Sequence, residues 1–173
     1  MDQFYSFIKE EDEDGSIFYL FVTRYNFVYA VYFKVDEYSD YVENFPLLLQ
    51  KGFAFGFRKN SLNDSQYKRS EDAQVFTTMY HIIKDFFKAN GNETVLLYHC
   101  DSADGRQFFR SKLFDKWQRQ VEETNFERHA INVSIADKDF YLGFITLTDN
   151  PSINQLREEF EAFSYFIIQP KNE

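Results

Sequence analysis

The chain has 173 residues, of which 28 are Asp or Glu and 19 are Lys or Arg, and its formal net charge is −9. Its hydrophobic content of 44% excludes intrinsic disorder, and no apolar run is long enough to span a bilayer. A single cysteine excludes an internal disulfide. The length fits one domain or at most two small ones, and we expect a single domain over residues 1–173.

The negative charge is concentrated at the start of the chain. Residues 1–50 carry 10 acidic and 3 basic residues, and they include a run of five acids: Glu10, Glu11, Asp12, Glu13 and Asp14. Such a run is typical of a solvated turn, but it also suits a basic protein partner. The excess of negative charge argues against duplex nucleic acid as a partner, because its phosphates would be repelled. The first residues lack the basic and apolar regions of a secretory signal, so we expect a cytoplasmic location.

Four strands are expected in the first part of the chain. Residues 4–8 form a short apolar segment, and residues 17–23 and 27–33 are two runs rich in β-forming side chains. The short link between these two runs predicts an antiparallel hairpin, with Asn26 in a left-handed turn conformation. Both faces of this hairpin carry aromatic residues, so part of its second face should be covered. Residues 53–57 alternate large and small side chains, as a strand with one filled face does.

The segments on either side of this fourth strand are expected to differ, one with a short helical turn and the other a loop. Residues 36–52 indicate a short helical turn, and the polar residues 59–71 indicate a long loop. Asp72 then begins a helix in which apolar residues repeat at helical spacing. Asn90 and Gly91 end this helix.

The later part of the chain is expected to contain further strands and two more helices. The helices are predicted over residues 106–121 and from Ser152 onward. The strands are predicted over residues 94–98, 129–135 and 140–147, with one last short strand at 165–168. The predicted fold class is α+β, a single domain with a mixed or mostly antiparallel sheet of about six to eight strands and three main helices.

The sharpest candidate site lies where a strand passes through a tight turn into the helix at 106–121. A helix N-terminus offers free backbone amides and the positive end of the helix dipole, so it binds anions readily. Arg106 and Arg110 lie four residues apart, on one face of the predicted helix, where both can hold one anion. Asp101 and Asp104 complete the predicted ligand-binding set. The structural alternative is that one Asp caps the helix and that the arginines belong to a solvated face.

His99 and Cys100 are secondary candidates at the same place. On a strand, His99 and Asp101 would point the same way and could reach one ion, but no second His or Cys at metal-ligand spacing accompanies them. A nucleophilic Cys100 would need a base close by, and neighbouring residues of a strand face opposite ways, which argues against His99. His81 or His129 could serve only if folding brought it close. We therefore predict no metal site and no cofactor.

The stretch around the candidate site resembles a signature in small uncharacterised proteins of Bacteroidota-type bacteria. The residues that carry the resemblance are Tyr98, Cys100, Asp101, Asp104, Arg106, Arg110, Leu113, Phe114 and Trp117. The paired aromatic strands before this stretch and the helix start at Asn150 and Pro151 after it also look similar. The family is a domain of unknown function, so the resemblance implies a bacterial source and no mechanism.

Two functions from different classes remain open at this point. The lack of a complete catalytic set, together with many aromatic residues beside acidic charge, favours a cytoplasmic protein-binding module rather than an enzyme. Its partner would be another protein or a second copy of this chain, rather than duplex nucleic acid or a membrane. The alternative is an enzyme or sensor for a phosphate-bearing small molecule. In that case Arg106 and Arg110 would hold the anion, and Asp101 or Asp104 would act as a base or metal ligand.

Overall fold

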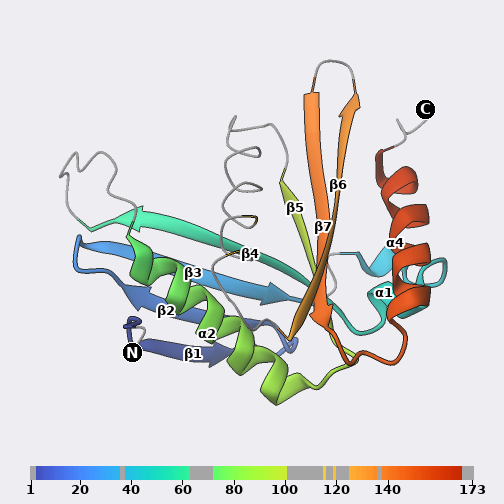
Figure 1. The fold of residues 1–173 in the computed structure, drawn as a ribbon. Helices are drawn as coiled ribbons and strands as arrows, with labels where there is room; N and C mark the ends of the chain where they lie inside the picture. Colours follow the sequence, from blue (N-terminus) through green and yellow to red (C-terminus); the bar gives the residue numbers. More distant parts are fainter. Residues whose placement is uncertain are drawn as a thin grey trace. The chain divides into compact units, whose positions relative to one another are not determined.

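Seven β-strands and three α-helices make up most of the described part of the chain (Figure 1). The computed structural model describes residues 3–35, 38–62, 72–100, 115, 119, 125–135 and 138–168. In chain order the elements are β1 (Phe7–Glu11), β2 (Ile17–Val22), β3 (Phe27–Lys34), the 3-10 turn η1 (Ser39–Tyr41), α1 (Pro46–Leu49), β4 (Gly52–Ser61), α2 (Ala73–Asn90), β5 (Val95–Cys100), β6 (Phe126–Ile135), β7 (Lys138–Leu147) and α4 (Ile153–Ile168). The strands belong to one mixed sheet in the order β1-β2-β3-β4-β5-β7-β6, which confirms the predicted α+β class.

The chain divides into two compact units. The first unit holds Met1–Val35 and Ala54–Gly91, and the second holds Asp36–Phe53 and Asn92–Glu173. The single domain expected over residues 1–173 stays a prediction.

In the first unit, β1 to β4 pair in chain order as antiparallel neighbours. The predicted hairpin is confirmed, and Asn26 in its turn has a φ of 59°, which Asn tolerates better than most residues do. The first strand starts later than predicted because Phe4 and Tyr5 contact α2 instead. The Phe4 ring stacks on that of His81, and the backbone N–H of Tyr5 donates to Thr78 Oγ1 at 2.9 Å.

Helix α2 covers one face of this antiparallel sheet (Figure 1). Both of its predicted ends are confirmed: Asp72 accepts a hydrogen bond from the backbone N–H of Gln74, and Gly91 follows the last turn with a φ of 90°. The rings of Phe33 and Phe86 stack with their centroids 4.1 Å apart. The buried residues of the helix are Val75, Thr78, Met79, Ile82, Ile83, Phe86 and Phe87.

The opposite face of the same sheet is only half-buried. Ile8 is 59% exposed and Val22 is 50% exposed. In the register, Ile8 lies opposite Leu20 and Val22 lies opposite Val28, so these side chains share one face. The hairpin residues on this face are intermediate or exposed and none of them is buried, so the expected cover of this face stays a prediction.

Strand β4 extends into a segment that was expected to be a loop. The prediction was wrong for residues 59–61, and residues 63–71 lie outside the described residues. The polar end of β4 is a strand because it pairs along the whole of β3, with Lys59 opposite Tyr29 and Ser61 opposite Phe27. The Lys59 ammonium also lies 4.0 Å from the centroid of the Phe27 ring, so its charge is stabilised against the sheet.

In the second unit, β7 lies between β5 and β6 and is antiparallel to both. Helix α4 packs on one face of these strands, and α1 lies beside it (Figure 1). Glu159 of α4 holds α1 in place, because its carboxylate accepts from the backbone N–H groups of Leu47 at 3.4 Å and Leu48 at 2.8 Å. The core contains Phe45, Leu48, Leu49, Val95, Leu97, Leu142, Phe144, Leu156, Phe160 and Phe163.

The predicted last strand at residues 165–168 is wrong, because α4 continues to Ile168. A short apolar run cannot by itself distinguish a strand from a helix. Here the preceding turns bury Phe160 and Phe163 in the core, whereas Tyr165 and Phe166 are exposed. The helix expected over residues 106–121 lies outside the described residues, apart from Asp115 and Arg119.

Candidate functional site

The structure describes only part of the predicted anion site. Strand β5 runs to Cys100, which pairs with Tyr141, and the preceding His99 pairs with Leu142 and is exposed. The four residues of the predicted ligand-binding set, Asp101, Asp104, Arg106 and Arg110, lie outside the described residues. Their role in binding a phosphate-bearing molecule therefore stays a prediction.

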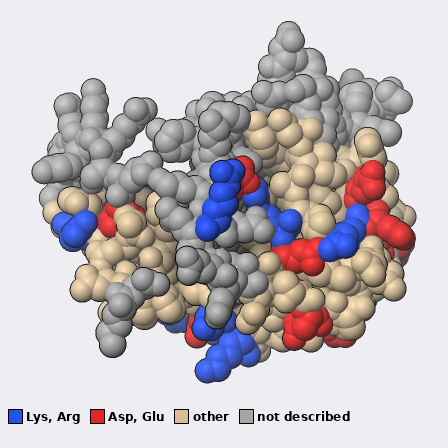
Figure 2. Space-filling model, in the orientation of Figure 1, with Lys and Arg blue, Asp and Glu red and all other residues tan. Residues whose placement is uncertain are grey.

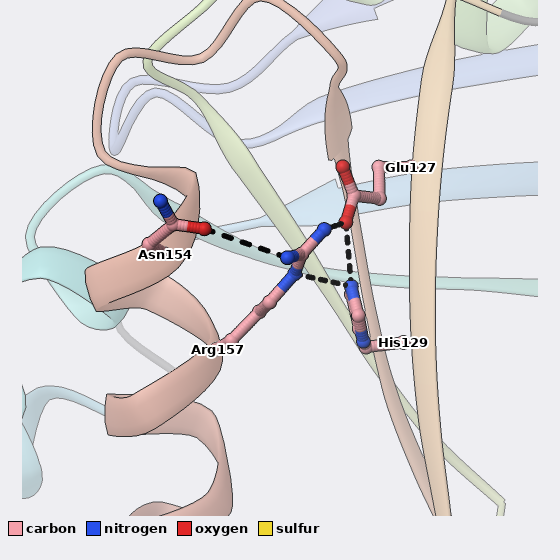
Figure 3. Close-up of polar contacts among 4 residues, drawn as sticks. All are labelled: Glu127, His129, Asn154 and Arg157. Carbon is pink, nitrogen blue, oxygen red and sulfur yellow. Dashed lines mark hydrogen bonds and ion pairs between the residues drawn. The ribbon is translucent and has the colours of Figure 1, made fainter.

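A cluster of polar side chains joins β6 to α4 (Figure 3). Arg157 of α4 donates from Nε to His129 Nε2 at 2.9 Å, and from Nη2 to Glu127 Oε1. The same Oε1 atom lies 2.7 Å from His129 Nε2. Nη1 of Arg157 reaches the side-chain oxygen of Asn154 at 3.4 Å. We call Glu127, His129 and Arg157 the β6–α4 cluster.

The geometry of β6 brings Glu127 and His129 together. Side chains two residues apart on a strand point to the same face, and here α4 covers that face. The His129 ring stacks on Phe144, which in turn contacts the Phe160 ring of α4 edge-on. Arg157 precedes Phe160 by three residues and so lies on nearly the same side of the helix. Figure 2 accordingly shows acidic and basic side chains next to each other on the part of the surface where α4 lies.

The protonation of His129 controls what this cluster can do. Burial lowers the pKa of His129, which favours the neutral ring at neutral pH. A neutral ring with a lone pair on Nε2 can accept the hydrogen that Arg157 offers. The cluster can therefore take up or release a proton at one defined atom.

Arg128, between Glu127 and His129 in sequence, points to the other face of β6. Its Nε donates to the Tyr98 hydroxyl at 2.6 Å, and its Nη1 pairs with Asp115. The Arg128 side chain is 9% exposed and that of Asp115 is 41% exposed. Burial alone would lower the pKa of Arg128, but its interactions with Tyr98 and Asp115 outweigh burial and raise it. Arg128 is thus a buried cation with Asp115 as its counter-charge.

The β6–α4 cluster could not be found by sequence reasoning. The sequence presents His129 as one of three histidines that share no spacing. The one local signal is the alternation of Glu127 and His129, which a strand starting before residue 129 would have placed on one face. Arg157 lies 28 residues further along the chain, and no local pattern connects it to His129.

Two further kinds of feature, a metal site and a membrane-spanning helix, are not found among the described residues. Among them, no group of three or more His, Cys, Asp or Glu side chains could hold a metal ion. None of the described helices is both long and apolar enough to cross a membrane.

A comparison with curated proteins finds no match. The sequence model of DUF6169, described as a family of unknown function, matches residues 71–162, which is more than half of the chain. The matched segment contains α2, β5, β6, β7 and the first turns of α4. The resemblance to a family of unknown function is therefore confirmed, whereas the Bacteroidota-type source stays a prediction. On this match, the chain belongs to DUF6169, a family of unknown function.

Proposed function

We propose that the protein is a cytoplasmic protein-binding module whose partner docks on the half-buried face of the β1–β4 sheet. We call this surface the open face and define it by the alternate apolar side chains that point away from α2. These residues are Ile8, Phe18, Leu20, Val22, Val28, Ala30 and Tyr32. The observation that supports the proposal is that none of them is buried, although the sheet is apolar on both faces.

The two faces of the β1–β4 sheet differ in how far their apolar side chains are buried. On the covered face, Tyr19, Val31 and Phe33 are completely buried. Removing apolar surface from water is worth about 25 cal/mol per Å², so α2 stabilises the face on which it packs. The open face is half-buried, so only part of such a free energy is available for a partner. Contiguous apolar surface of this kind commonly marks an interaction site.

The open face is bordered by acids on the β1 side and carries two bases, Lys34 and Arg58, on the β3 and β4 side. The acids on the β1 side favour a partner that is basic where it meets that border. Glu10 lies next to Phe18 in the register, on the same face as Ile8. The turn after β1 adds Asp12, Glu13 and Asp14, and all of these acids are exposed. A complementary partner would present an apolar stripe flanked by Lys or Arg. The same acidic border disfavours nucleic acid and anionic membranes.

A helical peptide of leucine and lysine tests this proposal, with a peptide in which glutamate replaces every lysine as its matched control. Fluorescence anisotropy should detect binding of the lysine peptide and much weaker binding of the glutamate peptide. Ile8→Ser and Val22→Ser should each weaken binding of the lysine peptide about tenfold, because burying one such side chain is worth about 1.5–3 kcal/mol. Leu47→Ser in the second unit changes a side chain that is 42% exposed and should leave the affinity unchanged.

Two outcomes would contradict the proposal. Equal affinity of the wild type and both open-face variants would show that the peptide binds elsewhere. The second outcome concerns the oligomeric state, which light scattering measures and which distinguishes a second copy of the chain from a basic partner. A dimer that Ile8→Ser converts to a monomer would show that the open face is covered by self-association.

A further inference from the structure

We infer that the β6–α4 cluster is a proton-operated clasp, in which neutral His129 holds Arg157 on β6 and protonated His129 releases it. The clasp lies in the second unit and is independent of the open face. Its three side chains come from two elements, Glu127 and His129 from β6 and Arg157 from α4 (Figure 3).

One nitrogen of His129 lies between two groups with opposite requirements. Nε of Arg157 carries a hydrogen and donates it to Nε2 over 2.9 Å, which requires a lone pair on Nε2. Oε1 of Glu127 lies 2.7 Å from the same Nε2 and is an acceptor, which requires a hydrogen on Nε2. The two hydrogen bonds cannot form together, so the protonation of Nε2 decides which one forms.

When the His129 ring is neutral, Arg157 donates hydrogen bonds to both His129 and Glu127 on β6. The ring hydrogen of His129 is on Nδ1, Nε of Arg157 donates to Nε2, and Nη2 donates to Glu127. The planar guanidinium suits this role, because its N–H groups form a fork that can reach two acceptors. One carboxylate and one guanidinium leave the cluster without net charge.

A proton taken from solvent by Nε2 reverses this arrangement. The new N–H donates to Oε1 of Glu127, the atom that Nη2 of Arg157 also uses, so the two cations compete for one acceptor. At the same time the Nε–H of Arg157 loses its acceptor and faces a second positive charge. The cluster then has a net charge of one, and repulsion acts between Arg157 and His129. Asn154 on the same helix already contacts Nη1 of Arg157, so it offers the guanidinium an alternative partner away from β6.

The release is confined to the start of α4. Leu156, Phe160 and Phe163 are buried in the core and keep the helix packed when Arg157 leaves. β6 is the last strand in the sheet order, so the departure of Arg157 uncovers charged groups on an edge strand.

The surroundings of His129 set the pH at which the clasp opens. Among the described residues, Glu127 from β6 and Arg157 from α4 are the charged groups in contact with it, and β7 contributes the uncharged ring of Phe144. Burial lowers the pKa of His129, so the clasp is closed at neutral pH. It opens below the ordinary histidine value of about 6.5.

An NMR titration of the three histidine side chains from about pH 8 to about pH 5 tests the clasp, with His81 and His99 as internal references. Arg157→Gln removes the like charge and should raise the pKa of His129 by about one unit. Glu127→Gln removes the counter-charge and should lower the pKa by a similar amount. Glu158→Gln alters an exposed neighbour of Arg157 on α4 and should shift the pKa much less than either change.

The Nε–H resonance of Arg157 in the wild type distinguishes a clasp from a plain titration. It should shift, and exchange faster with water, over the same pH interval in which His129 takes up its proton. A contact with a merely structural role would show no such link. An Arg157 resonance that stays constant while His129 titrates would overturn the clasp. A His129 pKa that shifts no more in Arg157→Gln and Glu127→Gln than in Glu158→Gln would overturn it as well.

Discussion

The ring of Tyr98 in β5 lies directly on the backbone of Gly143 in β7. The two residues are opposite each other in the β5–β7 register, and a Cβ atom on Gly143 would overlap the tyrosine ring. Tyr98 is buried, and its hydroxyl accepts a hydrogen bond from Arg128 Nε. Glycine is therefore required at position 143 by the close approach of a ring, rather than by an unusual backbone conformation.

We expect Gly143→Ala to lower the free energy of unfolding by about 2–3 kcal/mol, measured by urea denaturation. The added methyl group forces the buried Tyr98 ring to move, and the hydrogen bond to Arg128 is then lost. In a Tyr98→Leu background the same change should cost much less, because the ring is absent. Equal costs in the two backgrounds would show that the ring is not the cause.

The same arrangement recurs in the first unit with a different expected cost. Tyr32 of β3 lies on Gly56 of β4, its direct partner in the register. Tyr32 is only half-buried, however, so its ring can turn towards solvent when a methyl group is added. Gly56→Ala should therefore cost about 1 kcal/mol or less in the same urea experiment. A cost as large as that of Gly143→Ala would contradict this explanation.

The stability of the protein should fall in alkaline solution partly because of Tyr29. Burial, with a smaller effect of Asp72, raises the pKa of Tyr29 to about 12. An unfolded chain loses this proton near about pH 10, so between the two values the unfolded state binds fewer protons and stability falls as the pH rises. At about pH 11 this effect is worth about 1 kcal/mol.

Tyr29→Phe should remove this part of the pH dependence. Urea unfolding at about pH 8 and about pH 11 should show a smaller alkaline loss of stability in the variant than in the wild type. Tyr165→Phe, at a side chain that is 64% exposed, is the control and should leave the alkaline loss as it is in the wild type. Identical losses in wild type and Tyr29→Phe would rule out this contribution.

The pair of Arg128 and Asp115 gives a further stability prediction. Asp115→Asn leaves the buried guanidinium without its counter-charge and should lower the free energy of unfolding by about 1–2 kcal/mol. This loss is smaller than the loss expected for a fully buried ion pair, because Asp115 is 41% exposed. In an Arg128→Met background, Asp115→Asn should be nearly neutral, since no buried charge remains. A double-mutant cycle by urea denaturation measures the difference. Additive effects would show that the two groups do not interact.

Some elements were predictable because their signals are local. Asp72 marks the start of α2 by its side-chain cap, and Gly91 marks the end of α2 by a positive φ. Asn26 marks the turn between β2 and β3, also by a positive φ. The polar end of β4 and the last turns of α4 were predicted wrongly. The polar end of β4 is a strand because it pairs with β3, although its composition suggested a loop. The last turns of α4 are helical because the preceding turns pack in the core, although their apolar run suggested a strand.

The amino-acid sequence by itself determined the α+β class, the first hairpin and the boundaries of α2, because caps, turn residues and periodicity act within a few residues of each other. Only the tertiary structure decided which face of the β1–β4 sheet stays open, since both faces carry the same kinds of apolar side chain. It also decided that Tyr98 covers Gly143 and that Arg157 meets Glu127 and His129. These contacts join residues far apart in the chain, and their free energy comes from packing and burial, which no local pattern encodes.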